Sequence, residues 1–179
     1  MVEFKPVRRR DLCYRYLESP VGSLLLAGRD EEVHLIAFPS GSRAVAPLDG
    51  WTEDETCLRE VTSQLAAYFS GSLRRFELDL HFDGTEFQNR VWQELQAIPF
   101  GETISYGELA ERIGETKLAS RAVGAANGAN PLPIVIPCHR VIGADRSLTG
   151  FGGGLPRKTF LLKHEGVRLK EPSAQMTLF

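Results

Sequence analysis

The chain has 179 residues, of which 42% are hydrophobic and 25% are charged, and its formal net charge is −2. These values are ordinary for a globular protein of one domain or two small ones. No apolar run is long enough to span a membrane, and the basic N-terminus lacks the apolar stretch of a secretory signal, so we expect a cytoplasmic protein without a membrane partner.

The charge is distributed unevenly along the chain. Residues 1–85 carry 10 lysines and arginines against 14 aspartates and glutamates, a net of −4, and residues 86–170 carry 11 against 8, a net of +3. Only the second part could attract an anion through its general field. Because this excess is modest, we do not expect strong non-specific affinity for DNA.

The first half has the pattern of a small α/β unit. Residues 12–38 contain two apolar runs typical of strands, "GSLLLAG" and "VHLIAF", separated by a charged turn. Residues 54–71 repeat apolar side chains at three- and four-residue steps and end at a glycine, which predicts a helix. Residues 75–80, "RFELDL", alternate in polarity and predict a half-buried strand. No catalytic constellation is visible in this half.

The second half begins with two helix-start signals. Thr85 with Gln88, and Ser105 with Glu108, fit the capping box, in which a side chain and a backbone N–H satisfy each other at the first turn. Each pair is followed by apolar residues at helical spacing. We therefore expect one helix after Thr85 and a shorter one after Ser105.

Two more helices are expected further on. One lies within residues 117–131, is rich in Ala and Gly, and would form a helix-turn-helix with the preceding short helix. Such small side chains suit tight packing against another helix or entry into a narrow groove, and composition alone favours packing. The last helix is predicted at residues 155–166. We expect domains at 1–85 and 86–170, followed by a flexible tail at 171–179.

The stretch "PIVIPCHRVIG" places a thiol beside an imidazole and a guanidinium. The three cysteines are far apart and do not form a disulfide framework, so reduced thiols are the simplest interpretation. A metal is disfavoured at Cys138 because no second cysteine lies at ligand spacing. A nucleophile would need a base such as His139 and an orienting carboxylate, for which Glu165 is the best candidate. By spacing alone, however, Glu165 is an ordinary exposed glutamate.

Several longer blocks match one family. "FGETISYGELA", "SRAVGAANGANPLPIVIPCHRVIG" and "GFGGGLPRKTFLLKHEG" have the order and spacing found in the O6-alkylguanine-DNA alkyltransferases, or methylated-DNA–protein-cysteine methyltransferases, which this chain resembles. The match is close over residues 86–168 and less specific before them, where "SPVGSLLLAG" is the best block. The resemblance implies a ribonuclease H-like α/β domain followed by a mostly helical, winged helix-turn-helix-like domain that binds DNA and holds the active site.

The resemblance implies direct-reversal DNA repair. Cys138 would take the alkyl group from O6-alkylguanine, and by extension O4-alkylthymine, in a stoichiometric and irreversible reaction that needs no cofactor. His139 would be the base, acting through a water, and Glu165 would orient it. Asn130 would tie the helix-turn-helix to the active-site loop, and Tyr106 would donate a hydrogen bond to the departing guanine. Judged from the residues alone, Asn130 could simply be a turn residue before Pro131, and Tyr106 could pack in the core at the first turn of a helix.

The implied partner is double-stranded DNA that contains O6-alkylguanine. The second helix of the helix-turn-helix would enter the minor groove, and Arg121 would fill the gap left by a flipped base, although a phosphate contact is the simpler role for Arg121. The residues predicted to contact DNA are Arg121, Ala122, Ala125, Ala126, Gly128 and Arg140.

The residues predicted to form the substrate pocket are Val141, Gly143, Phe151 and Gly152. The backbone groups of Cys138, Val141 and Gly152 would contact the base. Phe151 stands where some members have tyrosine, so stacking is kept and a hydroxyl is lost. Gly143 and Gly152 are small where other members are bulkier, and we therefore expect tolerance of larger O6-alkyl groups.

Some members of the family bind a structural zinc in the first half. His34 falls where one ligand would be, but Arg10 and Arg29 fall where cysteines would be needed. We therefore predict neither a metal nor another cofactor.

The end of the chain, "QMTLF", raises a separate possibility. Its residues Gln175, Met176, Leu178 and Phe179 resemble the peptide with which many bacterial DNA-processing proteins bind the DNA polymerase sliding clamp. The alternative is a tail that packs on its own domain. We otherwise expect a monomer, associated with the nucleoid if the chain is bacterial.

Three other classes fit less well. A non-catalytic damage-binding relative would lack the thiol of Cys138. A helix-turn-helix regulator would need side chains that read base edges, which the Ala- and Gly-rich helix does not have. A thiol hydrolase would need an oxyanion hole and a different sequence around the cysteine.

Overall fold

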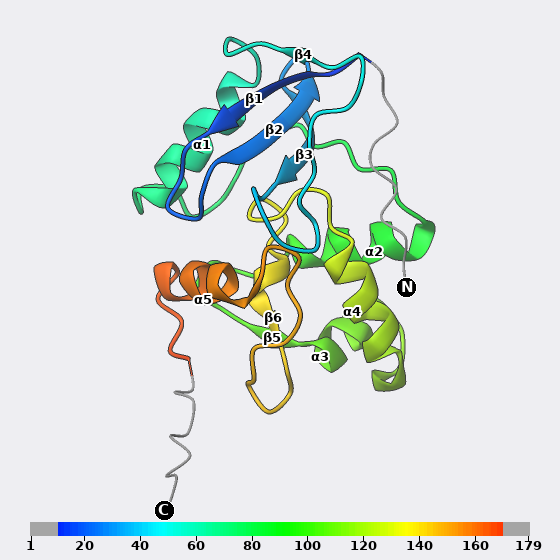
Figure 1. Ribbon diagram of the computed structural model, residues 1–179. Helices are drawn as coiled ribbons and strands as arrows, with labels where there is room; N and C mark the ends of the chain where they lie inside the picture. The colour runs from blue at the N-terminus through cyan, green and yellow to red at the C-terminus, as the bar shows by residue number, and fades with distance from the viewer. Residues whose placement is uncertain (1–10, 170–179) are drawn as a thin grey trace, which may run out of the picture.

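The computed structural model describes residues 11–169, and none of the helices in that range could span a membrane. Figure 1 shows a sheet with one helix in the upper half of the view and a cluster of helices in the lower half. The predicted fold class, a small α/β domain followed by a mostly helical one, is confirmed.

The first half is built on a four-stranded sheet. Its strands are β1 (Cys13–Leu17), β2 (Leu24–Arg29), β3 (Glu32–Ala37) and β4 (Thr52–Glu53), in the order β3-β2-β1-β4. The pairs β1–β2 and β2–β3 are antiparallel, and β1–β4 is parallel. Helix α1 (Arg59–Phe69) packs against this sheet through its buried face (Figure 1).

The central strand β2 is buried on both faces, which explains its continuous apolar run. Leu24 and Leu26 belong to the large core cluster, whereas Leu25 and Ala27 belong to a second cluster. Successive side chains of a strand point to opposite faces, so these two clusters lie on opposite faces of the sheet. The second cluster is covered by side chains of the loop 39–50, including Val45 and Leu48.

The predicted strand at residues 75–80 was wrong. Only Leu80 forms an isolated bridge, with Val33 at the edge of β3. The Gln64 side chain of α1 donates to O of Glu77 and accepts from its N–H, both at 2.8 Å. A helix side chain therefore satisfies the backbone of Glu77, while Val33 of β3 bonds to O of Asp79 and to N of His81.

The second half is mostly helical. Both predicted capping boxes are confirmed, at Thr85 with Gln88 and at Ser105 with Glu108. Two short strands, β5 and β6, pair in parallel. The elements are α2 (Glu86–Leu95), β5 (Ile104–Ser105), α3 (Tyr106–Arg112), a 3-10 turn (Lys117–Ala119), α4 (Ser120–Gly128), a second 3-10 turn (Cys138–Arg140), β6 (Val141–Ile142) and α5 (Leu155–His164).

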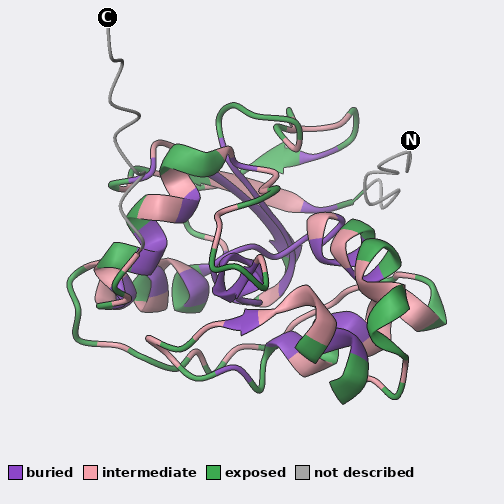
Figure 2. Ribbon diagram, turned by 90° about the horizontal axis from the view of Figure 1, so that it is seen from below, coloured by how far each residue is buried: buried purple, intermediate pink, exposed green. Residues whose placement is uncertain are grey.

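The two halves share one hydrophobic core. The large cluster joins Leu26 and Tyr68 of the first half to Trp92, Ile136 and Leu161 of the second. In Figure 2 the central strands and the inward faces of the helices are buried, while the outward faces are exposed. The active-site candidates from the second half therefore lie against a surface that the first half provides.

Candidate active site

Cys138 lies in the 3-10 turn that follows a tightly bonded loop. Asn130, just after α4, donates from Nδ2 to O of Ile136 at 2.7 Å, and its Oδ1 accepts from N of Leu132 at 2.9 Å. Asn127 of α4 donates to O of Cys138 at 3.3 Å. These bonds join the end of α4 to the segment that carries the thiol, which is the arrangement predicted for Asn130.

The thiol of Cys138 is buried, with 5% of the residue exposed. Burial raises the pKa of Cys138, and a hydrogen bond from Asn130 together with the positive charge of Lys158 oppose that rise. The thiol is therefore protonated at neutral pH, and a base is needed before the sulfur can act as a nucleophile.

His139 forms a buried pair with Glu165. Nε2 of His139 donates to Oε1 of Glu165 at 2.8 Å, and neither side chain is exposed to solvent. Burial lowers the pKa of His139, although the hydrogen bond and charge of Glu165 partly offset this. The imidazole is therefore neutral at pH 7. Its Nδ1 makes no hydrogen bond to any residue between 11 and 169, so it is available as a proton acceptor.

Glu165 lies at the centre of a buried network. Arg140 donates to it from Nε at 2.9 Å and from Nη2 at 3.0 Å, Tyr68 donates from its hydroxyl at 2.8 Å, and the N–H of Gly101 donates at 3.1 Å. Burial alone would raise the pKa of Glu165, but the hydrogen bonds and charges of His139 and Arg140 hold it well below its usual range. Glu165 is therefore a carboxylate fixed in position, and not an exposed glutamate.

The placement of Arg140 corrects one prediction. Arg140 was expected to contact DNA, but it is 6% exposed, and its guanidinium is held by Glu165 and by O of Ile98 at 2.5 Å. A buried cation next to a buried carboxylate is held in place by that pairing. Its position supports a role in holding Glu165.

Tyr106 begins α3 and is half-buried. Burial raises its pKa, and the charge of Cys138 adds to this effect. Its hydroxyl donates to O of Thr149 at 3.3 Å, in the segment that precedes Phe151. The side chain is therefore bonded to the segment 149–154, which we call the lid.

A small cavity of about 20 Å³ opens beside Cys138. Asn127 and Asn130 line it, as do the predicted pocket residues Phe151 and Gly152. The ring of Phe151 packs against Phe38 of the first half, with ring centroids 5.6 Å apart.

Val141 and Gly143 are not among the residues that line this cavity. The carbonyl of Val141 accepts a hydrogen bond from Lys158 Nζ at 2.6 Å, and its contact with the base stays a prediction. Gly143 lines a different hollow, beside Ser105 and Arg146, and a Cβ there would meet Oδ1 of Asp145 at 2.6 Å. The small size of Gly143 therefore does not widen the cavity beside Cys138.

Sequence reasoning missed Lys158, which is fully buried in α5. Its Nζ donates to O of Val141 at 2.6 Å, to O of Thr149 at 2.8 Å and to O of Gly150 at 3.5 Å. Burial lowers the pKa of Lys158 to about 8, and the charge of Cys138 opposes that shift. The signal was its position on the same helical face as Leu161 and Leu162, where a charge is unusual.

Helix α4 has an exposed face and a buried face. Arg121, Ala122 and Ala125 are exposed, which agrees with their prediction as DNA contacts. Ala126 is 4% exposed and its carbonyl accepts a hydrogen bond from Trp92 Nε1 at 2.9 Å, so it belongs to the core. Gly128 is half-buried and lines the cavity beside Cys138. Neither residue lies on the exposed face of α4.

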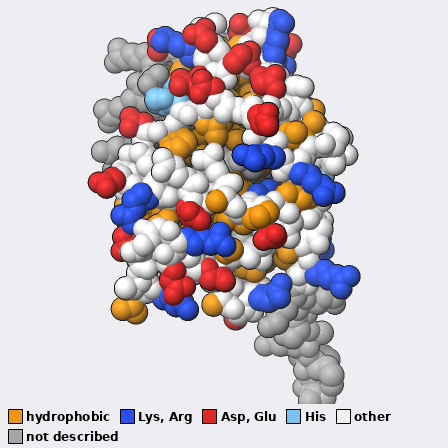
Figure 3. All heavy atoms as spheres, turned by 180° about the vertical axis from the view of Figure 1, so that it is seen from behind, with side chains coloured by type: hydrophobic (Ala, Val, Ile, Leu, Met, Phe, Trp, Pro, Cys, Tyr) orange, Lys and Arg blue, Asp and Glu red, His pale blue; other side chains and the backbone are white. Residues whose placement is uncertain are grey.

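The surface charges are mixed and do not form one strong patch on the face that Figure 3 shows. Acidic and basic side chains are interspersed there, above and below its centre. This distribution agrees with the modest net charge of the second half.

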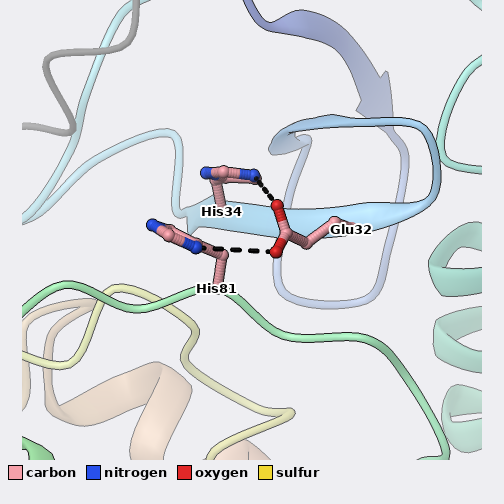
Figure 4. A group of neighbouring side chains, drawn as sticks. All are labelled: Glu32, His34 and His81. Atoms are coloured by element: carbon pink, nitrogen blue, oxygen red, sulfur yellow. Dashed lines mark hydrogen bonds and ion pairs between the residues drawn. The ribbon is translucent and has the colours of Figure 1, made fainter.

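A second group of metal-ligand side chains lies in the first half (Figure 4). Glu32 Oε2 accepts from His34 Nε2 at 2.6 Å, and Oε1 is 3.5 Å from His81 Nδ1. The two imidazoles are stacked, with centroids 4.4 Å apart. A structural zinc site has four ligands, often thiolates, whereas the described residues supply one carboxylate and two imidazoles here. This donor set does not fit such a site, and the absence of zinc stays a prediction.

Comparison with known proteins places both halves in one family. The model described as "6-O-methylguanine DNA methyltransferase, ribonuclease-like domain" matches residues 12–82, and the one described as "6-O-methylguanine DNA methyltransferase, DNA binding domain" matches residues 86–167. Proteins named methylated-DNA–protein-cysteine methyltransferase from Methanosarcina acetivorans and Mycolicibacterium paratuberculosis are each 51% identical to the chain. The alignments cover 86% and 93% of this chain, and 97% and 98% of the relatives.

Solved structures agree with these matches. The crystal structure of Mycobacterium tuberculosis OGT in complex with DNA is 46% identical, with a TM-score of 0.81, and the alignment covers 86% of this chain and 93% of that one. The M. tuberculosis O6-methylguanine methyltransferase structure is 45% identical, also with a TM-score of 0.81, over 90% and 96% of the two chains.

Proposed function

The chain belongs to the 6-O-methylguanine DNA methyltransferase family, and we propose that it repairs DNA by transferring the alkyl group of O6-alkylguanine to its own Cys138. One observation carries this proposal. A buried thiol lines a cavity, and the next residue, His139, is a neutral imidazole held by a buried carboxylate. This is the nucleophile, base and orienting group that a covalent transfer requires.

The first step is removal of the thiol proton. Because the pKa of Cys138 is raised and that of His139 is lowered, the thiol holds its proton and the imidazole can accept one. We assign His139 Nδ1 as the acceptor, with a water carrying the proton from Sγ. Glu165 then stabilises the imidazolium, and Arg140 and Tyr68 keep Glu165 ionised and in place.

The second step is an in-line displacement at the alkyl carbon. The new S–C bond forms as the C–O6 bond breaks, and the electron pair of that bond stays on the guanine. The Tyr106 hydroxyl stabilises the developing negative charge by donating a hydrogen bond to the guanine, in place of its present bond to Thr149. The displaced guanine anion takes up one proton, which balances the proton that His139 accepted. The products are unmodified guanine and a thioether on Cys138, so each molecule acts once and no cofactor takes part.

The target base must leave the double helix. Cys138 is 5% exposed, so its sulfur cannot reach a carbon inside a stacked duplex. The exposed face of α4 suits a narrow groove because Ala122 and Ala125 are small, and Arg121 lies beside them. We assign Arg121 to the gap that the flipped base leaves.

The proposal extends in three directions. O4-alkylthymine presents the same alkyl–oxygen bond and is a second substrate. The protein acts as a cytoplasmic monomer on DNA. The tail binds the sliding clamp through Gln175, Met176, Leu178 and Phe179. These four positions lie outside the described residues. The assignment fails if the purified clamp shows no affinity for the tail peptide.

The test is intact-protein mass spectrometry after incubation with a duplex that carries O6-methylguanine. We expect wild type and Cys57→Ala to gain the mass of one CH2, and Cys138→Ala to gain nothing. If wild type still binds the damaged duplex without any gain in mass, the transfer is wrong and a non-catalytic damage sensor replaces it.

A further inference from the structure

The cavity beside Cys138 has one wall that comes from the first half of the chain. Its lining includes Phe38, which directly follows β3, and Arg43, which lies in the loop 39–50. In Figure 1 this loop, in cyan, reaches from the sheet toward the helical half. The shape of the cavity therefore depends on both halves of the molecule.

The loop 39–50 is fastened to the lid. N of Arg43 donates to O of Gly152 at 3.3 Å. Arg157 of α5 donates from Nη1 to O of Ser40 at 3.0 Å and to O of Gly153 at 2.8 Å, and from Nη2 to Oγ of Ser40 at 3.1 Å. The base of the Arg43 side chain is therefore fixed relative to the lid.

The side chain of Arg43 fills the space beside Gly152. A Cβ built at Gly152 would overlap Cγ of Arg43 and would lie 2.9 Å from its Cβ. The backbone of Gly152 is not in the left-handed region, so the approach of Arg43, and not the backbone conformation, excludes a side chain here. The room that Gly152 leaves is thus taken by Arg43, which corrects the expectation that this glycine widens the pocket.

Arg43 is half-buried at the edge of this cavity. Burial lowers the pKa of Arg43, and the charge of Cys138 opposes that shift. Both residues also line the same cavity.

We propose that Arg43 is a specificity-determining residue whose bulk limits the size of the O6-alkyl group that the cavity accepts. This inference rests on the proposed alkyl transfer. The cavity has to hold a guanine and its substituent, although the space open in it here is only about 20 Å³. A methyl group needs little room beyond the base, so its transfer depends less on the bulk of Arg43 than the transfer of a larger group does. A benzyl group must share the space that the stem of Arg43 occupies.

The experiment compares two duplexes, one with O6-methylguanine and one with O6-benzylguanine, in single-turnover rates. Arg43→Ala removes bulk and charge, and Arg43→Met removes the charge but keeps a long stem. Arg75→Ala is the control, because Arg75 is exposed and lines no part of this cavity. We expect the benzyl-to-methyl rate ratio to rise about tenfold in Arg43→Ala, the size of effect that small changes in pocket volume produce. The ratio stays near wild type in Arg43→Met and Arg75→Ala.

Each result is decisive. A ratio in Arg43→Ala within about twofold of wild type overturns the inference. A rise of equal size in Arg43→Met also overturns it, because charge and not bulk would then set the limit. Circular dichroism spectra of the same samples report whether the variants are folded. If wild type itself fails to transfer methyl, the proposed function has failed, which is a different result.

Discussion

The Tyr68 hydroxyl, in the first half of the chain, donates a hydrogen bond of 2.8 Å to Oε1 of Glu165, 97 residues away in the second half. The same oxygen accepts from His139 Nε2. The first half therefore takes part directly in holding the carboxylate that orients the base. The hydrogen bond also explains why a tyrosine hydroxyl is tolerated at a position with no exposed surface.

Tyr68→Phe removes this hydrogen bond and keeps the ring. Hydrogen bonds to charged groups are worth about 1.5–3 kcal/mol, so we expect the free energy of unfolding to fall by that amount. The transfer rate should fall several-fold, because Glu165 loses one of its donors. Urea unfolding and single-turnover kinetics measure the two effects. Tyr16→Phe, at a surface position, is the control and should change neither.

Glu165→Gln tests the orienting carboxylate. The variant leaves the Arg140 guanidinium buried without its counter-charge, which costs about 3–5 kcal/mol of stability when a buried pair is broken. It also removes the charge that stabilises the His139 imidazolium, and we expect the transfer rate to fall by about a hundredfold or more. Glu60→Gln, on the exposed face of α1, is the control. A transfer rate close to wild type would show that Glu165 is only structural.

The pKa of His139 predicts how stability and rate depend on pH. Burial lowers the folded-state pKa of His139 below its usual value of 6.5. As the pH falls below 6.5, the unfolded chain takes up a proton that the folded protein does not, so the free energy of unfolding decreases. The transfer rate should decline only at lower pH, where the folded imidazole is protonated. In His139→Gln, the decrease in the free energy of unfolding below pH 6.5 should be smaller than in wild type. A transfer rate that already declines above pH 6.5 would contradict the lowered pKa of His139.

Lys158→Met tests the buried lysine beneath the lid. It removes three hydrogen bonds to backbone carbonyls, and each unsatisfied buried group costs about 1–3 kcal/mol, so we expect lower stability and slower transfer. The folded-state pKa of about 8 lies below the usual 10.5, so between these values the unfolded chain binds more protons. Between about pH 8 and 10.5 the free energy of unfolding of wild type should therefore increase with pH relative to that of Lys158→Met. Urea unfolding at several pH values measures this, and the same pH dependence in both proteins would refute the prediction.

Arg121→Ala separates DNA handling from chemistry. Arg121 is exposed on α4 and does not line the cavity beside Cys138, so transfer from free O6-benzylguanine should be unchanged. Transfer from a duplex should fall about tenfold or more, equivalent to roughly 1.4 kcal/mol of lost stabilisation of the flipped state. Arg75→Ala controls for the loss of one positive charge. Equal losses with both substrates would place Arg121 in the active site instead.

The local features of this protein follow from its sequence. Both capping boxes formed as predicted, because each joins a side chain to a backbone group only three residues away. The strand predicted at residues 75–80 did not form, because the backbone of Glu77 bonds to the distant side chain of Gln64 and only the end of the segment bonds to β3. Alternating polarity predicts which side chains of a segment are buried, but it does not predict which groups form hydrogen bonds with the segment's backbone.

The sequence by itself determined that Cys138 and His139 are neighbours, which helices begin where, and which family the blocks around "PCHRV" resemble. Only the tertiary structure decided that the His139 imidazole points to Glu165, that Arg140 is buried beside it, and that Arg43 crosses from the first half to the cavity. The physical reason is the distance along the chain over which each kind of interaction acts. Caps and turns are set by interactions between near neighbours in the chain, whereas the ionisation and shape of a buried site depend on groups brought from distant segments by the common core.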